Sequence, residues 1–436
     1  ELDNSDTFLS RSISRTLKID NLKKILIVAG ESHLHLVQKT IKEFPDINCS
    51  ILVEPEARNT APAIYSAAKY INDLDKDSTM LVIPSDHYYE EEALINTVNA
   101  VLKVKKENQI ITLGVKPSSP EIGYGYIHHN AKEEVLKKII MFKEKPDLET
   151  AKEYFSTNDF FWNSGINIFD SSIIIQEFKQ HARELESVDL KFYKENNLIR
   201  IEKEEFSKLP NISIDYAILE KSENTYTSEF LGNWSDIGSW HSLRELRKNT
   251  KENNTIFGKN IFFEDSKDNI VYSKTRTIGV SGLDNLAIID TPDALLITNL
   301  EKRENANRIL EQINEANKDI FEMNKRVYRP WGWFESIDNG DNHQVKRIHV
   351  YPQEELSVQK HFHRSERWVV IKGEPEIRIG SKSKVYKEGS MIAIGKEEIH
   401  SLANPTNNEV EIIEVQLGHY LGEDDIVRYS DKYGRK

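Results

Sequence analysis

A short polar segment near the C-terminus carries residue types that bind metal ions in proteins. Gln359, His361 and His363 alternate along a run that predicts a β-strand, so their side chains are expected on one face of a sheet. Glu366 follows three residues later in the same segment. Imidazole nitrogens and carboxylate oxygens are good ligands for Zn²⁺ and similar divalent ions. We therefore predict a metal site formed by His361, His363 and Glu366.

Two aspartates in the first half of the chain and just beyond it suit a different ion, Mg²⁺. Asp86 follows an apolar run at residues 79–84 that predicts a buried strand. Parallel sheets bind their ligands at the carboxyl ends of their strands, where this side chain is expected. Asp236 stands far along the chain in the segment WSDIGSW, which predicts a tight turn. Two such carboxylates can share one Mg²⁺ ion that bridges phosphate oxygens.

Several short segments suit a phosphorylated sugar and a nucleotide. Arg58 and Asn59 stand at the expected start of a helix, where a guanidinium and backbone N–H groups can bind an anion or a base edge. Lys145 can place a point charge on a phosphate, and Glu144 can accept hydrogen bonds from sugar hydroxyls. Asn163 can both donate and accept, as hydroxyl recognition requires. Taken singly, each segment is also typical of turns and helix caps.

Composition limits the classes of protein that these residues could serve. Of the 436 residues, 38% are hydrophobic and 30% are charged, which is a globular balance. No apolar run approaches the ~20 residues that span a bilayer, which excludes a membrane protein. With 58 Lys and Arg against 71 Asp and Glu, the formal net charge of −13 disfavours a general nucleic-acid binder. A single cysteine, Cys49, permits neither an internal disulfide nor a thiolate metal cage. No charged and then apolar leader is visible, so a cytoplasmic location is expected.

The elements that hold the first group of residues alternate between strands and helices. Strands are predicted at 24–30, 49–53, 79–84 and 109–115, with helices at 34–44 and 60–74 and another that ends near 106. This alternation predicts an α/β, Rossmann-like domain over residues 1–250, with a mostly parallel sheet. Such a domain usually opens with a strand and a glycine-rich phosphate turn. Residues 6–17 instead predict a helix, so we expect that this strand and its loop are missing from the chain.

The rest of the chain changes to short strands. Residues 253–299 show brief β-runs separated by turn residues, which predicts a small all-β module, and residues 301–324 predict a polar linker helix. This module and helix are assigned to residues 251–325. Strands dominate again over residues 326–436, with no helix between them, and predict an antiparallel sandwich or barrel. Near its end the acidic run at 423–425 predicts a solvated turn.

In order along the chain, EP at 54–55, RNTAPA at 58–63, GYGYI, EKP, WNSG, SIDYA and WSDIGSW closely resemble mannose-1-phosphate guanylyltransferases. The resemblance covers the whole chain and implies a nucleotide-diphospho-sugar transferase fold. It implies transfer of GMP from GTP to mannose 1-phosphate, which gives GDP-mannose and pyrophosphate. It also implies that Asp86 and Asp236 hold Mg²⁺ and that Lys145 acts in catalysis. The substrate-binding residues that it implies are Glu54, Arg58, Asn59, Tyr124, Gly125, Glu144, Asn163 and Asp215.

The histidine segment is similar to the first cupin motif, with Gly373 after it. A second cupin motif has the spacing of Gly389, His400 and Asn404, although Gly395 and Glu397 stand where that motif usually has Pro and Gly. The resemblance adds His400 to the metal ligands and makes Gln359 a further candidate. The C-terminal domain as a whole resembles the type II phosphomannose isomerase half of bifunctional enzymes. That resemblance implies interconversion of fructose 6-phosphate and mannose 6-phosphate through a cis-enediol.

For this reaction the resemblance makes Arg364 the candidate for the phosphate or the developing enediolate. Single-function guanylyltransferases also carry such a cupin, so isomerase activity stays open at this point. The middle module resembles a short left-handed β-helix that joins the halves or helps subunits pair, and a homo-oligomer is expected.

One departure and two alternatives remain. The family opens with a GGxGTRxWP segment that handles the triphosphate and is not found here, so we expect weak nucleotide transfer by this chain. A nucleotidyltransferase that uses UTP or ATP is one alternative, against which the RNTAPAI segment argues by resemblance. A non-catalytic protein that binds sugar phosphates or metal ions is the other.

Overall fold

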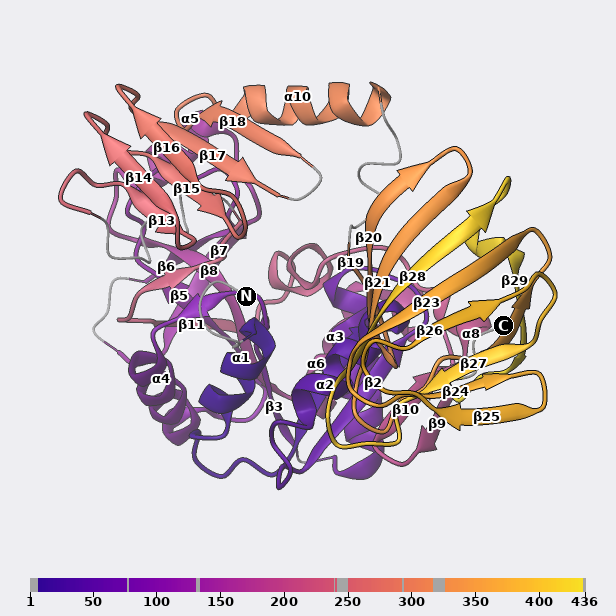
Figure 1. Cartoon of the computed structure of the whole chain (residues 1–436). Coiled ribbons are helices and arrows are strands. Elements are labelled where there is room, and N and C mark those ends of the chain that lie inside the picture. Colours follow the sequence, from indigo (N-terminus) through magenta and orange to yellow (C-terminus); the bar gives the residue numbers. More distant parts are fainter. Residues whose placement is uncertain are drawn as a thin grey trace. The chain divides into compact units, whose positions relative to one another are not determined.

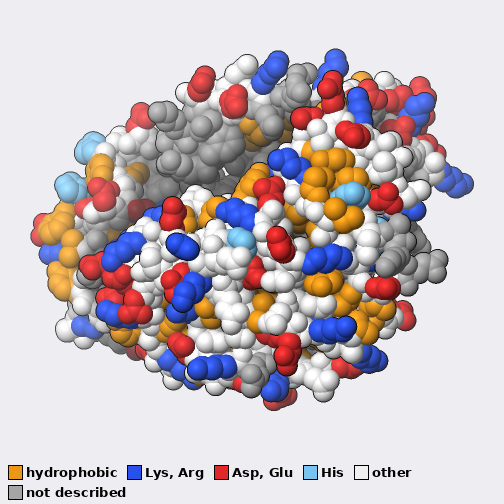
Figure 2. All heavy atoms as spheres, turned by 180° about the vertical axis from the view of Figure 1, so that it is seen from behind, with side chains coloured by type: hydrophobic (Ala, Val, Ile, Leu, Met, Phe, Trp, Pro, Cys, Tyr) orange, Lys and Arg blue, Asp and Glu red, His pale blue; other side chains and the backbone are white. Residues whose placement is uncertain are grey.

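The computed structural model describes residues 7–76, 78–130, 134–238, 240, 250–291, 294–316 and 326–433. The chain divides into two compact units, Glu1–Lys248 and Asn249–Lys436, and each is described by itself (Figure 1). Among the helices in the described ranges, none has the length and apolar character that a membrane crossing requires. Acidic and basic side chains are interspersed over the face drawn in Figure 2, which is typical of a solvent-exposed surface.

The first unit combines helices with two larger sheets and a two-stranded sheet of β4 and β12. Its helices are α1 (Phe8–Thr16), α2 (Leu34–Ile41), α3 (Thr60–Leu74), α4 (Glu91–Val104), α5 (Leu148–Phe155), α6 (Ser171–His181), α7 (Arg183–Glu186) and α8 (Lys203–Phe206), with the short turns η1 (Glu31–His33) and η2 (Asp215–Leu219). Its strands are β1 (Ile25–Gly30), β2 (Cys49–Glu54), β3 (Thr79–Val82), β4 (Tyr88–Tyr89), β5 (Ile110–Val115), β6 (Tyr126–His129), β7 (Lys137–Lys143), β8 (Phe160–Asp170), β9 (Phe192–Glu195), β10 (Leu198–Ile201), β11 (Thr225–Glu229) and β12 (Trp234–Ser235).

The predicted α/β class is confirmed, but the direction of many strands differs from the prediction. One sheet has the order β1-β2-β10-β9, and its first three strands are parallel. The larger sheet has the order β3-β8-β5-β11-β7-β6, in which only β5 and β11 pair in parallel. The expectation of a mostly parallel sheet is therefore wrong here. The reason is the long strand β8, which runs antiparallel between β3 and β5 and so reverses both ladders.

One hydrophobic core joins both larger sheets of this unit to helices α3 and α6. Tyr65 of α3 and Phe178 of α6 are fully buried, and their rings meet edge to face with centroids 5.2 Å apart. Leu52 of β2 and Ile110 of β5 belong to the same cluster. Burial of each such side chain contributes roughly 1.5–3 kcal/mol, and this core fixes the strand ends that carry the candidate site residues.

The middle of the chain forms the predicted β-helix. Its elements are β13 (Thr255–Phe257), β14 (Ile261–Glu264), β15 (Ile270–Ser273), β16 (Ile278–Ser281), β17 (Leu286–Asp290), β18 (Leu295–Asn299) and α10 (Arg303–Ala316). Strands β13, β15 and β17 pair in parallel, as do β14 and β16, so the chain winds as a solenoid. Buried Asn269 donates from Nδ2 to Oδ1 of Asn254 at 3.1 Å and links successive coils. The C-terminal part of the predicted linker helix, 317–324, lies outside the described residues.

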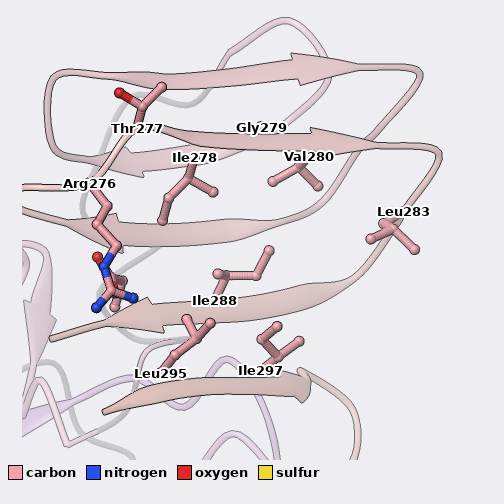
Figure 3. Close-up of a pocket in the computed structure, with 10 residues that line it drawn as sticks. Arg276, Thr277, Ile278, Gly279, Val280, Leu283, Ile288, Leu295 and Ile297 are labelled. Carbon is pink, nitrogen blue, oxygen red and sulfur yellow. The ribbon is translucent and has the colours of Figure 1, made fainter. Parts of the chain in front are cut away.

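This β-helix carries an open apolar groove of about 370 Å³ (Figure 3). The aliphatic side chains that line it come from three consecutive strands and one turn. They are Ile278, Val280, Leu283, Ile288, Leu295 and Ile297, with Arg276 at one end.

The C-terminal region is the predicted antiparallel jelly roll. Its elements are β19 (Arg326–Arg329), β20 (Gly332–Gly340), β21 (His343–Val350), β22 (Val358–His361), β23 (Arg364–Lys372), β24 (Glu376–Ile379), β25 (Lys382–Val385), β26 (Met391–Ile394), β27 (His400–Ala403), β28 (Val410–Gly418), η3 (Glu423–Asp425) and β29 (Ile426–Ser430). The strands form two sheets with the orders β19-β20-β21-β28-β23-β26 and β25-β24-β27-β22-β29.

The inner face of this barrel changes from apolar to polar along single strands. On β28, Val410 and Ile412 belong to the hydrophobic core, and the next two inward positions are Glu414 and Gln416. All four are buried. Buried polar groups require hydrogen-bond partners or ligands, so the polar end of the barrel is where a functional site is expected.

Candidate active sites

Asn163 on β8 is held in one orientation by its neighbours in the first unit. Its Oδ1 accepts a hydrogen bond from the Thr112 hydroxyl at 2.8 Å, and its Nδ2 donates to Oδ1 of Asp215 at 2.9 Å. Burial raises the pKa of Asp215 above its usual range. An amide and a carboxyl group fixed in this way can recognise the hydroxyl groups of a sugar.

Glu144 and Gly125 lie beside this pair. A Cβ atom at Gly125 would stand 2.6 Å from Oε2 of Glu144, so only glycine lets the carboxyl group approach this backbone. The backbone N–H of Asn163 donates to the Gly125 carbonyl at 2.8 Å. Burial, with Asp215 nearby, raises the pKa of Glu144 to about 7, and Lys145 acts against that rise. The structure thus brings these five predicted residues together.

Lys145 is the exposed cation of this group. Its Nζ lies 3.7 Å from Oε1 of Glu144, and the side chain is 61% exposed. The residue has a φ of 45°, an uncommon value for a side chain other than glycine. An exposed ammonium on a strained turn beside buried carboxyl groups suits contact with an incoming phosphate.

The two candidate Mg²⁺ ligands flank the pairing of strands β4 and β12, Asp86 two residues before β4 and Asp236 directly after β12. Tyr88 lies opposite Ser235 in this antiparallel pair, which places Asp236 next to His87. Burial lowers the pKa of His87, while Asp86 and Asp236 both raise it, so both carboxylates lie near this ring. Carboxylate oxygens on a partly exposed turn fit the oxygen ligands that Mg²⁺ prefers.

Tyr124 connects these aspartates to the sugar side. Its hydroxyl donates to Oδ1 of Asp236 at 2.9 Å, and its ring packs edge to face on Trp162 and Trp234. Because Tyr124 directly precedes Gly125, the aspartates and the Asn163 group belong to one region of the unit.

The predicted nucleotide-side residues have structural partners in this fold. Arg58 donates from Nε and Nη2 to Oε1 of Glu56, at 2.9 and 2.7 Å, and from Nη1 to the carbonyl of Leu209 at 2.6 Å. Asn59 caps α3, and its Oδ1 accepts a hydrogen bond from the Thr60 N–H at 2.9 Å. The guanidinium therefore braces this loop instead of projecting from it.

Glu54 ends β2 at the same edge of the unit. Its Oε1 is buried and has no hydrogen-bond partner among the described residues. Burial raises the pKa of this carboxyl group to about 7. A buried acceptor without a donor costs free energy, and a ligand hydroxyl or N–H would recover it.

In the C-terminal barrel, His361, Glu366 and His400 form a cluster whose candidate ligand atoms lie within 4.8 Å of one another. Nε2 of His361 is 3.0 Å from Oε1 of Glu366, and Nε2 of His400 is 3.5 Å from Oε2. The Nδ1 of His400 donates to the carbonyl of Glu398 at 2.8 Å, which leaves Nε2 as a lone-pair donor. That Nε2 has no hydrogen-bond partner within the described part of the chain.

These three side chains fit a divalent ion. They are at most 2% exposed, and two imidazole nitrogens with a carboxylate are a donor set found around Zn²⁺ and related ions. Burial acts to raise the pKa of Glu366, but His361, His400 and Arg364 together lower it below its usual range. The carboxylate is therefore ionised and available as a ligand.

His363 does not lie with them, and its prediction as a ligand is corrected. Strand β22 ends at His361, so the alternation of side chains stops there. The imidazole of His363 is 61% exposed, and its Nδ1 lies 2.8 Å from Oδ1 of Asp425. The backbone N–H groups of Phe362 and His363 also donate to that carboxylate, at 3.1 Å each.

Gln359 takes the place that the sequence prediction gave to a histidine. It lies two residues before His361 and directly opposite His400 in the antiparallel pair of β22 and β27. Its side chain therefore shares their face. In this chain the cupin pattern consists of Gln359, His361 and Glu366, with four residues between His361 and Glu366. This assignment follows from the point at which β22 ends. The spacing of the two histidines in the sequence could not reveal that point.

The sequence prediction missed two further polar residues at the cluster, Glu414 and Gln416. Trp368 donates from Nε1 to Glu366 at 3.1 Å and to Glu414 at 3.0 Å, and Gln416 donates to Glu414 at 2.9 Å. Burial, with Glu366 nearby, raises the pKa of Glu414 to about 8. The alternating run from Val410 could have indicated both residues, since every second side chain faces inward.

Arg364 and the acidic run also belong to this end of the barrel. Arg364 is 2% exposed and donates to Glu366 at 3.2 Å and to the Gly422 carbonyl at 3.0 Å. Glu423 lies 2.5 Å from Nζ of buried Lys346. Asp425 is 5% exposed. The prediction that residues 423–425 form a solvated turn holds for Glu423 and Asp424, which are exposed, but not for Asp425, whose buried carboxylate accepts backbone N–H groups.

Family models match three consecutive segments of the chain. Residues 2–253 match the family described as Nucleotidyl transferase, and residues 259–313 match the MannoseP isomerase/GMP-like beta-helix domain. Residues 316–431 match Mannose-6-phosphate isomerase C-terminal. The order of these matches is that of the α/β unit, the β-helix and the barrel.

Individual proteins resemble the chain along nearly its full length. It is 34% identical over 451 residues to Mannose-1-phosphate guanylyltransferase of Salmonella montevideo, an alignment that covers 100% of the chain and 94% of that relative. It is 35% identical over 415 residues to Xanthan biosynthesis protein XanB of Xanthomonas campestris pv. campestris (strain B100), with 94% and 88% covered. The crystal structure of mannose-1-phosphate geranyltransferase from Thermus thermophilus matches with a TM-score of 0.60 at 23% identity, over 71% of this chain and 90% of that one, which supports the fold alone.

Proposed function

Because the chain belongs to the mannose-1-phosphate guanylyltransferase family, we propose that its first unit transfers GMP from GTP to mannose 1-phosphate. The products are GDP-mannose and pyrophosphate. The observation that carries this proposal is the fixed group of Asn163, Asp215 and Glu144 beside the paired aspartates. This arrangement supplies sugar recognition and an ion site in one region.

The reaction requires positioning more than covalent chemistry from the protein. A phosphate oxygen of mannose 1-phosphate attacks the α-phosphorus of GTP in line, and the bond from that phosphorus to the pyrophosphate oxygen breaks. Asn163 and Glu144 orient the sugar through its hydroxyl groups, and Lys145 binds its phosphate. Asp86 and Asp236 would hold Mg²⁺, which supplies charge neutralisation on the phosphate oxygens. Arg58 maintains the loop that leads into α3.

A product analysis tests this function. The chain is incubated with mannose 1-phosphate, Mg²⁺ and equal amounts of GTP, UTP and ATP, and the nucleotide sugars are separated by mass. GDP-mannose as the main product is expected. A UDP- or ADP-sugar in excess would favour another nucleotidyltransferase, and mannose 1-phosphate binding without any product would favour a non-catalytic binding protein.

For the barrel, the buried His361–Glu366–His400 cluster beside Arg364 favours a second activity. It would interconvert fructose 6-phosphate and mannose 6-phosphate, a reaction that moves a hydrogen between C1 and C2 of the open sugar. The cluster, with Gln359, would hold a divalent ion such as Zn²⁺, which supplies polarisation of a carbonyl. Arg364 is the candidate cation for the substrate's phosphate or for the negative charge that develops on the enediolate oxygen. Conversion of one hexose phosphate into the other by the chain tests this activity directly.

The substrates and products suggest a place in the synthesis of mannose-containing polysaccharides. One relative is named for xanthan biosynthesis and another, 33% identical, for alginate biosynthesis. A homo-oligomer stays part of the proposal, and the apolar groove of the β-helix offers a surface for it. Light scattering of the purified chain measures its mass in solution.

A further inference from the structure

The polar end of the barrel contains a buried lysine whose partner comes from outside the barrel strands. Lys346 on β21 is 5% exposed and lies directly opposite Glu414 on β28. Its Nζ pairs with Glu423 of η3 at 2.5 Å, and the Glu423 side chain is 51% exposed. A buried ammonium needs a counter-charge, and here that charge reaches in from a surface turn.

The residue before Glu423, Gly422, also directs an oxygen atom at a buried cation, Arg364. The carbonyl of Gly422 accepts a hydrogen bond from Nη1 of Arg364 at 3.0 Å. Burial acts to raise the pKa of Glu423, but Lys346, Arg364 and Arg329 together lower it below its usual range. Two consecutive residues thus direct oxygen atoms at two buried cations.

The segment directly before Glu423 has no regular secondary structure. Within the continuous described stretch 326–433, residues 419–422 belong to no helix or strand. The turn is anchored after them by Asp425, which accepts backbone N–H groups of Phe362 and His363 at 3.1 Å. Glu423 can therefore leave Lys346 while its anchor at Asp425 stays in place.

We propose that Lys346 and Arg364 form the binding site for the phosphate group of a sugar phosphate, and that Glu423 occupies this site until the ligand replaces it. This inference rests on the isomerase activity proposed above and names the residues that bind its substrate's phosphate. A phosphomonoester carries more negative charge than one carboxylate and offers three acceptor oxygens, so it can satisfy both cations at once.

The position of Lys346 agrees with this assignment. Strands β21, β28 and β23 are adjacent (Figure 1). In their register Lys346, Glu414 and Trp368 stand opposite one another. Two strand spacings of about 4.8 Å separate β21 from β23, which carries Glu366. The phosphate would thus bind on the Lys346 side of the cluster, with Arg364, which contacts Glu366, between them, and the carbon chain of the sugar would extend toward the metal ligands.

Calorimetric titration of the full chain with mannose 6-phosphate tests the site. Lys346→Met should weaken binding about 10-fold or more, as expected for the loss of a charge-assisted hydrogen bond. Glu423→Gln keeps the size of the side chain but removes the competing charge, so binding should tighten several-fold. Lys372→Met, at a surface lysine paired with Glu409, and Asp424→Asn, next to Glu423, are matched controls that should leave affinity unchanged.

Any other result would overturn either the site, its ligand or the isomerase activity. Unchanged affinity in Lys346→Met, no gain in Glu423→Gln, or no binding by the unaltered chain would overturn the site. Inorganic phosphate that binds as tightly as mannose 6-phosphate would overturn its assignment to a sugar phosphate. If the predicted affinity changes are seen but no hexose phosphate is converted, the phosphate site stands and the proposed isomerase activity is wrong. Conversion with an unchanged KM in Lys346→Met would overturn the site and leave the isomerase intact.

Discussion

Gln359 lies directly opposite His400 in the antiparallel pair of strands β22 and β27. This pairing places both side chains, with His361, on the inner face of the barrel. It determines which of the polar residues in the segment 359–366 can reach a common ion. The site is thus framed by residues from β22, β23 and β27, and His363 lies outside it.

Gln359→Ala should weaken metal binding by the barrel roughly 10-fold, in the range found when groups that support a metal site are removed. The expected cause is the loss of a fourth polar side chain next to the three-residue cluster. Competition with a chelator, with the bound metal measured by mass spectrometry, gives the affinity. Gln344→Ala is the control, since Gln344 bonds Ser336 instead of the cluster. Equal affinities for the two variants would remove Gln359 from the site.

Glu54→Gln should stabilise the chain without ligand, and more so at high pH. Burial raises the pKa of Glu54 from 4.5 to about 7, so the folded chain holds a proton there that the unfolded chain has lost. Stability from this group is therefore full below pH 4.5 and decreases as the pH rises to about 7. The amide avoids this loss, worth about 1–2 kcal/mol at pH 8 after allowance for partial exposure. Urea unfolding at pH 5 and pH 8 checks it, and a gain that is equal at both values would contradict it.

Asn163→Asp should reduce kcat/KM for mannose 1-phosphate about 100-fold, which corresponds to about 2–3 kcal/mol. The change removes a hydrogen-bond donor. It also places a second carboxyl group next to Asp215, whose Oδ1 lies 2.9 Å from Nδ2 of Asn163. Thr112→Val serves as comparison, because it removes only the hydroxyl that orients the amide and should cost less. A near-normal rate in Asn163→Asp would show that this amide does not bind the sugar.

Asp236→Asn should raise the Mg²⁺ concentration needed for half-maximal guanylyl transfer at least about 10-fold, since a charged oxygen ligand is lost. Tyr124→Phe removes only the hydrogen bond to that carboxylate and should change the requirement little. Initial rates measured against Mg²⁺ concentration distinguish the two. An unaltered Mg²⁺ dependence in Asp236→Asn would exclude this residue as a ligand.

Local features of the fold could be predicted from the sequence because short-range physics decides them. Helix α3 begins at Thr60, as predicted, and Asn59 caps it because the asparagine side chain accepts a hydrogen bond from the next N–H. The alternating strands of the barrel were likewise predictable from their period of two.

Features that depend on distant residues could not be predicted in this way. Strand β22 ends at His361 because Asp425, more than 60 positions away, binds the next two N–H groups. Lys346 and Glu423 are 77 positions apart, and no local pattern indicates that they form an ion pair. The direction of β8 is also set by its partners β3 and β5, which no local signal reveals.

One measurement tests most directly whether the chain holds two independent active sites with the assigned residues. Metal content, hexose 6-phosphate interconversion and GDP-mannose formation are measured in the same samples of the unaltered chain, His361→Ala and His363→Ala. We expect His361→Ala to lose the barrel metal and the isomerisation and to keep GDP-mannose formation, while His363→Ala keeps all three. Retention of metal and isomerisation in His361→Ala, or their loss in His363→Ala alone, would contradict the account.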